Sequence, residues 1–566
     1  MRGAEVLVKI LEAYDVKHVF GLPGDTSVPL YDALYNAQPG IRHVMARDER
    51  SAAFMADAYA RVSFKPGVCE GPSGGGATYI LPGVAEAYKS SIPLIVLTTD
   101  ISLQYVNKGM LTEIDQVSLF RPVTKWSSQL AHAGKIPEAL RRAFRVATTG
   151  KSGPVHLSLP KNVLEEEAEA EIYAEDKCKS YPSHRRHPDP EDVKRAAALL
   201  LKAERPVVVA GGGVIISQAW SELVELAKLL GLPVATTITG KGSIPEDHPL
   251  SLGVIGENGG RPYANRLVEE SDLVFFMGCK TGSVATRKWT TPPPGTKIIH
   301  SDVDPEVMGN NYPTEVGLLG DAKLVLQDLV ETLRIRLKGG KFEKTERLEE
   351  IRRLAEEWRE AFTSKMRSDS TPIKPQRVIG ELREALPRDC ILVVDAGTGT
   401  PFASSYFDIL SPGRGFVCFR AFGQLGTAVP GCIGAKTAAP SRAVVGLSGD
   451  GGFTFSVGEL ETARRVGVDF TVLIFNNGCF GWIKALQHLY CDARYISVDF
   501  SDIDYSRVAE AFGCRGIRVE RPGELEEALR AALKSGGPTL IDVVTEPLHS
   551  ELPPVAPWIE KSSAVK

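Results

Sequence analysis

Short apolar runs of strand length alternate with helical patterns along almost the whole chain. Six of these runs are followed by a glycine-rich or polar turn, and they lie at 93–98, 206–210, 273–277, 390–394, 443–447 and 471–475. Runs that are apolar throughout are typical of strands that are buried on both faces of a parallel sheet. The pattern therefore predicts an α/β protein built from doubly wound parallel sheets.

Two charged stretches divide the chain. Its 566 residues exceed what a single hydrophobic core usually supports. Residues 165–191 and 338–375 are rich in charge and contain several prolines, which is typical of connecting segments. The second stretch also predicts an exposed helix at 346–359. We expect three parallel-sheet domains at 1–170, 190–337 and 372–550.

Composition narrows the classes of partner. Charged residues make up 24% of the chain, the net charge is −4 and no long basic block occurs, so we expect no nucleic-acid partner. The apolar runs are strand-sized and the first residues lack a secretory pattern, so we expect no membrane span. Nine cysteines without CxxC spacing predict free thiols and a cytoplasmic location.

Two polar motifs follow neighbouring strand-like runs near the end of the chain. Gly449, Asp450, Gly451 and Gly452 come after the run at 443–447, and Asn477 follows the run at 471–475. Positions 450 and 477 are 27 apart, about one strand–helix–strand crossover. Both should lie at the carboxyl ends of adjacent parallel strands, where open α/β sheets bind ligands.

The residue types in these motifs suit Mg²⁺, which prefers oxygen ligands and shares them with phosphates. We expect the Asp450 carboxylate, the Asn477 amide and the Cys479 backbone carbonyl to be its ligands. The three glycines would let the backbone approach a diphosphate closely. Taken singly, each motif is also compatible with a simple turn.

Together the two motifs resemble the cofactor motif of thiamine-diphosphate-dependent enzymes. Residues 47–61 in turn resemble the catalytic helix of the acetolactate synthase group, with Asp48 in place of a histidine and Ala58 in place of a glycine. The resemblance implies that Glu49 is the catalytic glutamate, which hydrogen-bonds the cofactor's pyrimidine ring and assists proton removal from its thiazolium C2. The alternative for Glu49 is a glutamate that stabilises the first turn of a helix.

The resemblance covers almost the whole chain. The chain also resembles the pyruvate oxidase and benzaldehyde lyase relatives of the acetolactate synthase group. It implies a pyrimidine-binding first domain, a central domain and a diphosphate-binding third domain. It also implies a bulky side chain under the cofactor at Leu425, with a core leucine as the alternative. The remaining cofactor-binding residues that it implies are Gly24, Thr78, Gly397, Thr398 and Gly399.

The sequence departs from the family's motifs at several positions, so the resemblance determines neither the substrate nor whether FAD is bound. The segment 280–284 replaces a family motif that contributes to flavin recognition, so FAD in the central domain stays an open alternative. Thr112 and Gln116 are candidate substrate contacts. Trp482 and Leu486 are candidates too, and they would share one face of a helix, lining a substrate site or packing into the core.

We expect an enzyme that decarboxylates a 2-oxo acid, joins the resulting carbanion to a carbonyl acceptor, or does both. The resemblance also implies a homodimer or homotetramer in which Glu49 and Asp450 of different chains serve one cofactor. An aldehyde lyase or carboligase acting on aldehydes, a flavin-dependent oxidase of pyruvate type and a non-catalytic homologue are the alternatives.

Overall fold

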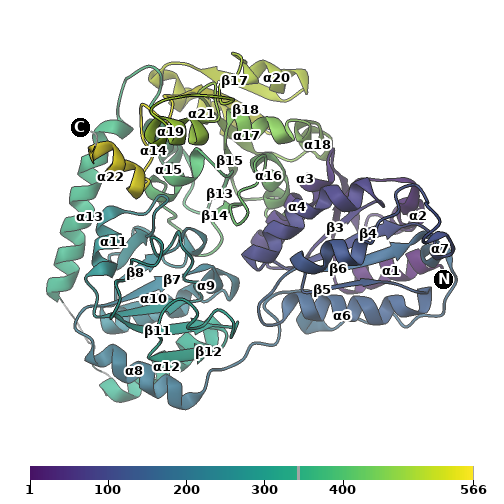
Figure 1. Ribbon diagram of the computed structural model, residues 1–566, viewed down its shortest axis with the longest axis horizontal. Coiled ribbons are helices and arrows are strands. Elements are labelled where there is room, and N and C mark those ends of the chain that lie inside the picture. The colour runs from purple at the N-terminus through teal and green to yellow at the C-terminus, as the bar shows by residue number, and fades with distance from the viewer. Residues whose placement is uncertain (339, 341–344, 565–566) are drawn as a thin grey trace.

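The computed structural model describes residues 1–338, 340 and 345–564, and these form three α/β units (Figure 1). Each unit contains one six-stranded sheet in which every paired strand is parallel, as predicted. The described part of the chain contains no helix that is both long and apolar enough to cross a membrane.

The first unit, purple to blue in Figure 1, has the strand order β2-β1-β3-β4-β6-β5. These strands are Arg42–Met45, His18–Gly21, Gly67–Gly71, Leu94–Asp100, Val155–Pro160 and Trp126–Gln129. The helices α1 to α7 are Gly3–Ala13, Val28–Asn36, Glu49–Ser63, Gly75–Ser90, Gln116–Phe120, Ile136–Thr148 and Lys161–Glu165.

The central unit, drawn in teal, has the order β12-β11-β10-β7-β8-β9, which is the strand order of dinucleotide-binding domains. These strands are Val316–Leu319, Lys297–Asp302, Leu273–Met277, Pro206–Ala210, Val234–Thr236 and Ser251–Val254. The helices α8 to α12 are Pro190–Lys202, Gly212–Ile216, Trp220–Leu230, Pro262–Glu269 and Ala322–Leu337.

The third unit, green to yellow, repeats the topology of the first, with the order β14-β13-β15-β16-β18-β17. These strands are Phe416–Cys418, Ile391–Val394, Val444–Gly449, Thr471–Asn476, Thr539–Val544 and Arg515–Val519. The helices α14 to α22 are Pro375–Ala385, Gly399–Tyr406, Ala428–Ala438, Asp450–Phe453, Glu459–Val466, Gly481–Tyr490, Tyr505–Ala511, Leu525–Leu533 and Ala556–Ala564.

The strands of each sheet fall within one of the three predicted domains, while the boundaries themselves stay predictions. The helix expected at 346–359 is α13, Thr345–Met366, which runs along the left edge of Figure 1. It is not exposed on every side, because Ile351 is buried and the Trp358 ring lies 5.8 Å from that of Tyr263. Residues 339 and 341–344 of the predicted connecting segment lie outside the described residues.

Helices α3 and α16 join the first unit to the third. Phe54 on α3 and Phe419 belong to one shared hydrophobic core, and their rings lie 5.6 Å apart. Gly434 on α16 lies so close to α3 that a Cβ there would overlap the Met55 carbonyl oxygen. This packing fixes the start of α3, where Glu49 lies, relative to the third unit.

A buried ion cluster joins the central unit to α15 of the third unit. Lys241 lies 2.6 Å from Glu246, which lies 3.0 Å from Arg261, and all three side chains are buried. Lys241 also donates to the Ser404 carbonyl oxygen and Arg261 to that of Ser405. The cluster holds the second half of α15, the helix that begins at the predicted diphosphate loop.

Candidate active site

Glu49 begins α3 and lies against the loop that follows β3. The Asp48 side chain accepts a hydrogen bond from the Arg50 amide at 2.8 Å, so the residue that replaces the family's histidine serves as the helix cap. A Cβ on Gly71 would lie 3.6 Å from Glu49 Cγ, and one on Gly76 would lie 3.2 Å from Glu49 Oε1. Burial raises the pKa of Glu49, which favours the protonated form that the predicted role requires.

Three more predicted residues lie around the loop at 71–76. A Cβ on Gly24 would lie 2.5 Å from Pro72, so the loops after β1 and β3 touch. Thr112 Oγ1 lies 2.7 Å from Ser73 Oγ. Thr78 lies in the first turn of α4 and donates to the Gly75 carbonyl oxygen at 2.9 Å. The structure thus brings Gly24, Thr78 and Thr112 to the same sheet edge as Glu49.

Gln116 directs its side chain into the interior of the first unit. Its side chain is buried, its amide nitrogen donates to the Thr99 carbonyl oxygen at 3.0 Å, and its amide oxygen accepts from the Thr98 hydroxyl. Both ends of the amide are therefore engaged inside the first unit. This geometry supports a structural role for Gln116 and gives no support to substrate contact.

The two polar motifs of the third unit meet as predicted. Strands β15 and β16 are parallel neighbours, with Gly449 opposite Phe475. Asp450 Oδ2 accepts from the amides of Asn477 at 3.0 Å and Gly478 at 2.7 Å, which ties one loop to the other.

The donor set at this edge fits a hard divalent cation. Asp450 supplies a carboxylate, Asn477 an amide oxygen and Cys479 a backbone carbonyl, all oxygen ligands of the kind that Mg²⁺ prefers. The Cys479 thiol donates to Asn477 Oδ1 at 3.3 Å, so two of these three residues are in direct contact. Burial raises the pKa of Asp450 to about 6, and a bound cation would offset the cost of its buried negative charge.

The predicted diphosphate loops lie side by side at the switch point of the third sheet, between β13 and β15. Gly397 has a φ of +106°, which favours glycine, and α15 begins two residues later at Gly399. A Cβ on Gly449 would lie 3.7 Å from Thr398 Oγ1. One on Gly451 would come within 2.8 Å of the Phe480 ring. A side chain at Gly451 would therefore displace the Phe480 ring, whereas no neighbouring atom lies within 4 Å of the place where a Cβ on Gly397 would stand.

Asp395 organises these loops and was missed as a site residue. Its buried carboxylate accepts from the Gly426 amide at 3.0 Å, from the Thr427 amide at 3.2 Å and hydroxyl at 2.8 Å, and from the Ser448 hydroxyl at 2.9 Å. A Cβ on Gly452 would lie 2.7 Å from Asp395 Oδ2. The residue stands two positions before Gly397, the first of the predicted cofactor-binding residues at 397–399, but its partners come from loops far along the chain.

Leu425 lies in the loop that Asp395 holds, and it is half-buried. The preceding Gln424 donates to the Pro82 carbonyl oxygen of α4 at 3.1 Å, and the Phe422 amide donates to Glu86 at 3.1 Å. The loop therefore lies at the boundary between the first and third units. Its predicted role beneath the cofactor stays a prediction.

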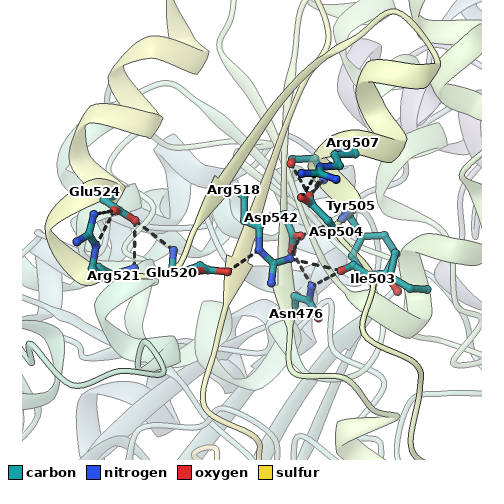
Figure 2. A network of polar contacts seen from close by, with 11 residues as sticks. Asn476, Ile503, Asp504, Tyr505, Arg507, Arg518, Glu520, Arg521, Glu524 and Asp542 are labelled. Carbon is teal, nitrogen blue, oxygen red and sulfur yellow. Dashed lines mark hydrogen bonds and ion pairs between the residues drawn. The ribbon is translucent and has the colours of Figure 1, made fainter.

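A second missed carboxylate, Asp542, anchors the Asn-Asn loop (Figure 2). It accepts from the Asn476 side chain at 2.9 Å, from the Tyr505 amide at 3.0 Å and from Arg518 at 2.8 Å. Asn476 also donates to the Ile503 carbonyl oxygen at 3.1 Å. The first asparagine of the pair thus fixes the loop through its side chain, and the second donates its backbone amide to Asp450.

Trp482 and Leu486 lie on α19, the helix that directly follows this loop. Both are half-buried and pack against the hydrophobic core of the third unit. The Trp482 ring lies 4.4 Å from that of Trp558 on the C-terminal helix α22. These contacts favour the packing interpretation for Trp482, and the substrate role of both residues stays a prediction.

The two halves of the site draw their contacts from different units. The side chains and loops that face Glu49 belong to the first unit, and those that face Asp450 belong to the third. Within the described ranges, no hydrogen bond or ion pair joins Glu49 to the Asp450 loops.

Comparison with known proteins decides the family. Three sequence models of thiamine pyrophosphate enzymes match: the N-terminal TPP binding domain at residues 1–119, the central domain at 193–329 and the C-terminal TPP binding domain at 395–543. The chain belongs to the thiamine pyrophosphate enzyme family. The chain is thus a thiamine-diphosphate-dependent enzyme, and each matched region lies within one of the three units and contains most of the strands of its sheet.

The curated relatives of this family member include acetolactate synthase large subunits. A probable acetolactate synthase large subunit of Methanocaldococcus jannaschii is 38% identical, over 98% of this chain and 94% of the relative. One from Methanococcus aeolicus is 37% identical over the same shares. The acetolactate synthase isozyme 3 large subunit of Escherichia coli is 33% identical, over 94% of this chain and 92% of its own length.

Proposed function

We propose that the chain binds thiamine diphosphate through Mg²⁺, decarboxylates a 2-oxo acid and joins the product to a carbonyl acceptor. The observation that carries the cofactor part is the junction of the two loops through Asp450, which accepts from both the Asn477 and Gly478 amides. The reaction follows from nearly full-length similarity to acetolactate synthase large subunits.

Each part of the site has a defined task in this proposal. Asp450, Asn477 and the Cys479 carbonyl would hold Mg²⁺, and the glycines of the loops leave space for the diphosphate. The cofactor supplies a nucleophilic carbon and an electron sink when it is bound. Glu49 holds a proton at the sheet edge of the first unit and donates it to the pyrimidine ring. Leu425 supports the ring system from below.

We propose further that the working unit is a homodimer or a dimer of dimers, in which Glu49 of one chain faces Asp450 of another. Exposed apolar side chains near both halves of the site support this proposal. Tyr79 is 59% exposed, Leu111 82% and Phe422 55%. Apolar side chains that gather around a site in this way mark an interaction surface. Sedimentation velocity with activity measured over the same concentrations checks the proposal, and a monomer that keeps full activity would contradict it.

We propose that the reaction needs no flavin. The Gly211 amide donates to the Met277 carbonyl oxygen and the Gly213 amide to that of Gly278, both at 2.9 Å. These amides are engaged within the fold and are not free to bind a pyrophosphate. The visible absorption spectrum of the purified protein checks this, and a stoichiometric flavin band near 450 nm would favour the oxidase alternative.

Incubation of the holoenzyme with pyruvate tests the proposed reaction. We expect release of CO₂ and formation of acetolactate, and both should depend on added thiamine diphosphate and Mg²⁺. Cleavage or joining of aldehydes without turnover of any 2-oxo acid would instead establish the aldehyde lyase alternative. We also propose a cytoplasmic location, which nine free thiols support.

A further inference from the structure

Three side chains of the segment between the first and central units meet at one point. Glu175, Cys178 and His184 each offer one atom of a type that binds metal ions. Cys178 Sγ lies 3.4 Å from Glu175 Oε2 and 3.9 Å from His184 Nε2. All three ligand atoms lie within 4.8 Å of one another. Within the described part of the chain, no other group of three histidine, cysteine or acidic side chains is this compact.

These distances are close to those in a tetrahedral zinc site. Zn²⁺ binds a thiolate sulfur at about 2.3 Å and an imidazole nitrogen or a carboxylate oxygen at about 2.0–2.2 Å. Two such ligands at the tetrahedral angle lie about 3.4–3.6 Å apart. Cys178 and Glu175 already have this separation, and His184 is exposed, so its ring is free to turn closer to the sulfur.

The other contacts of these side chains leave the three ligand atoms available. Arg145 on α6 donates to Glu175 Oε1 at 2.6 Å, and the second oxygen, Oε2, is the one that faces the thiol. Cys178 is buried and His184 is exposed, so the thiol lies inside the fold and the imidazole lies at the surface. A cation can therefore enter from the solvent side.

The segment that carries these residues is attached to both neighbouring units. Ser183 Oγ lies 2.8 Å from Thr148 Oγ1 at the end of α6. Arg185 forms an ion pair at 2.8 Å with Asp321, the residue that caps α12 of the central unit. A metal ion held between these two attachments would fix the chain at the point where it passes from the first unit to the central unit.

The ligand types favour zinc. A thiolate and an imidazole suit Zn²⁺, whereas Mg²⁺ and Ca²⁺ prefer oxygen ligands such as those of the Asp450 loops. Three protein ligands leave the fourth tetrahedral position to a water molecule. Binding would replace the proton of the Cys178 thiol by the metal, and this proton would pass to solvent. The three residues contain no CxxC spacing, so their meeting depends on the fold.

We propose that Glu175, Cys178 and His184 bind Zn²⁺, and that the metal fixes the connection between the first and central units. The proposal is independent of the proposed reaction, because the three residues belong to neither half of the predicted cofactor site.

Titration of the holoenzyme with Co²⁺, a spectroscopic substitute for Zn²⁺, tests the site. The protein is first freed of metal with a chelator and then loaded with thiamine diphosphate and saturating Mg²⁺, so that the predicted oxygen site is filled. We expect one Co²⁺ per chain, a thiolate-to-cobalt charge-transfer band and the intense visible bands of tetrahedral geometry. Zn²⁺ should displace the Co²⁺, and competition with a chromophoric chelator gives its affinity.

Variants of the proposed ligands and matched controls identify the site. Cys178→Ser should abolish the charge-transfer band, and Cys491→Ser, at an exposed cysteine, should leave it unchanged. His184→Ala should weaken Zn²⁺ binding by more than about 100-fold, since even partners of metal ligands are worth 10- to 100-fold. His187→Ala, at another exposed histidine of the segment, should bind as wild type. Hydrogen exchange of the peptide at 175–185 should slow when Zn²⁺ is added to wild type.

Several results would overturn the proposal. These are the absence of a thiolate band in wild type, a band that survives in Cys178→Ser, and equal Zn²⁺ affinity in His184→Ala and His187→Ala. If Cys178→Ser does not fold, the comparison of the two exposed histidines decides. Zn²⁺ binding that leaves exchange at 175–185 unchanged would refute the fixing of the connection.

Discussion

Substitution of Asp395 should separate the diphosphate loops from one another. In Asp395→Ala the amides of Gly426 and Thr427 lose their acceptor in the interior, while the Ser448 hydroxyl can turn to the Gly449 carbonyl oxygen at 3.0 Å. Each orphaned buried amide costs about 1–3 kcal/mol. Loss of a buried charge, whose burial raises the pKa of Asp395, offsets part of this cost. The net cost is about 2–4 kcal/mol.

Asp395→Asn should be milder. The amide oxygen can still accept from the Thr427 amide and hydroxyl, and the new NH₂ group can donate to Ser448. Only the Gly426 amide loses its acceptor, which costs about 1–2 kcal/mol. If cofactor binding must reorder these loops, affinity for thiamine diphosphate should fall about 30- to 1,000-fold in Asp395→Ala and roughly tenfold in Asp395→Asn.

Two assays measure these effects together. Calorimetry gives the cofactor affinity at saturating Mg²⁺, and hydrogen exchange with mass spectrometry reports the protection of the peptide at 422–428. Asp389→Ala, at an exposed carboxylate just before β13, serves as the control. If Asp395→Ala bound the cofactor as wild type and kept the exchange protection of this peptide, the organising role of Asp395 would be refuted.

Two further variants probe the predicted catalytic and substrate residues. Glu49→Gln should retain cofactor and lose most C2 proton exchange, visible by NMR. Because the pKa of Glu49 is raised, its charged form destabilises the fold, so Glu49→Gln apoprotein should unfold at higher urea than wild type at pH 8. That difference should shrink as pH falls below the raised pKa and vanish below the ordinary pKa of a glutamate, 4.5; a difference that is constant with pH would contradict it. Leu486→Ala should change relative kcat/KM across 2-oxo acids about tenfold if Leu486 contacts substrate. A common factor for all substrates with a lower melting temperature would assign Leu486 to the core.

The sequence was sufficient to predict the sheets and the pairing of the metal loops. Asp450 and Asn477 follow apolar runs one crossover apart, and parallel topology then places both at one sheet edge. Spacing does not determine which distant loops a buried carboxylate will join. Asp395 and Asp542 therefore remained unrecognised, since the partners described above lie 24 to 66 positions away in the chain.

The direction in which a side chain points could not be predicted from the sequence either. Gln116 was assigned to substrate because it lies near Thr112 in sequence. A short helix begins at Gln116, and its side chain turns to Thr98 and Thr99 in the interior. Helical spacing predicted that Trp482 and Leu486 share one face of α19. It could not predict that Trp482 packs against α22, because that helix begins 66 residues after Tyr490, the last residue of α19. Such contacts depend on tertiary packing and not on local pattern.

Calorimetric titration of thiamine diphosphate with Mg²⁺ into the wild-type apoprotein and into Asp450→Ala tests the central claim most directly. We expect one cofactor per chain in the wild type, with binding that requires the metal. Asp450→Ala removes the charged ligand and the acceptor for the Asn477 and Gly478 amides, so no binding should be detectable at the same concentrations. Equal affinity in the two proteins, or wild-type binding that is indifferent to Mg²⁺, would contradict the assignment of this site.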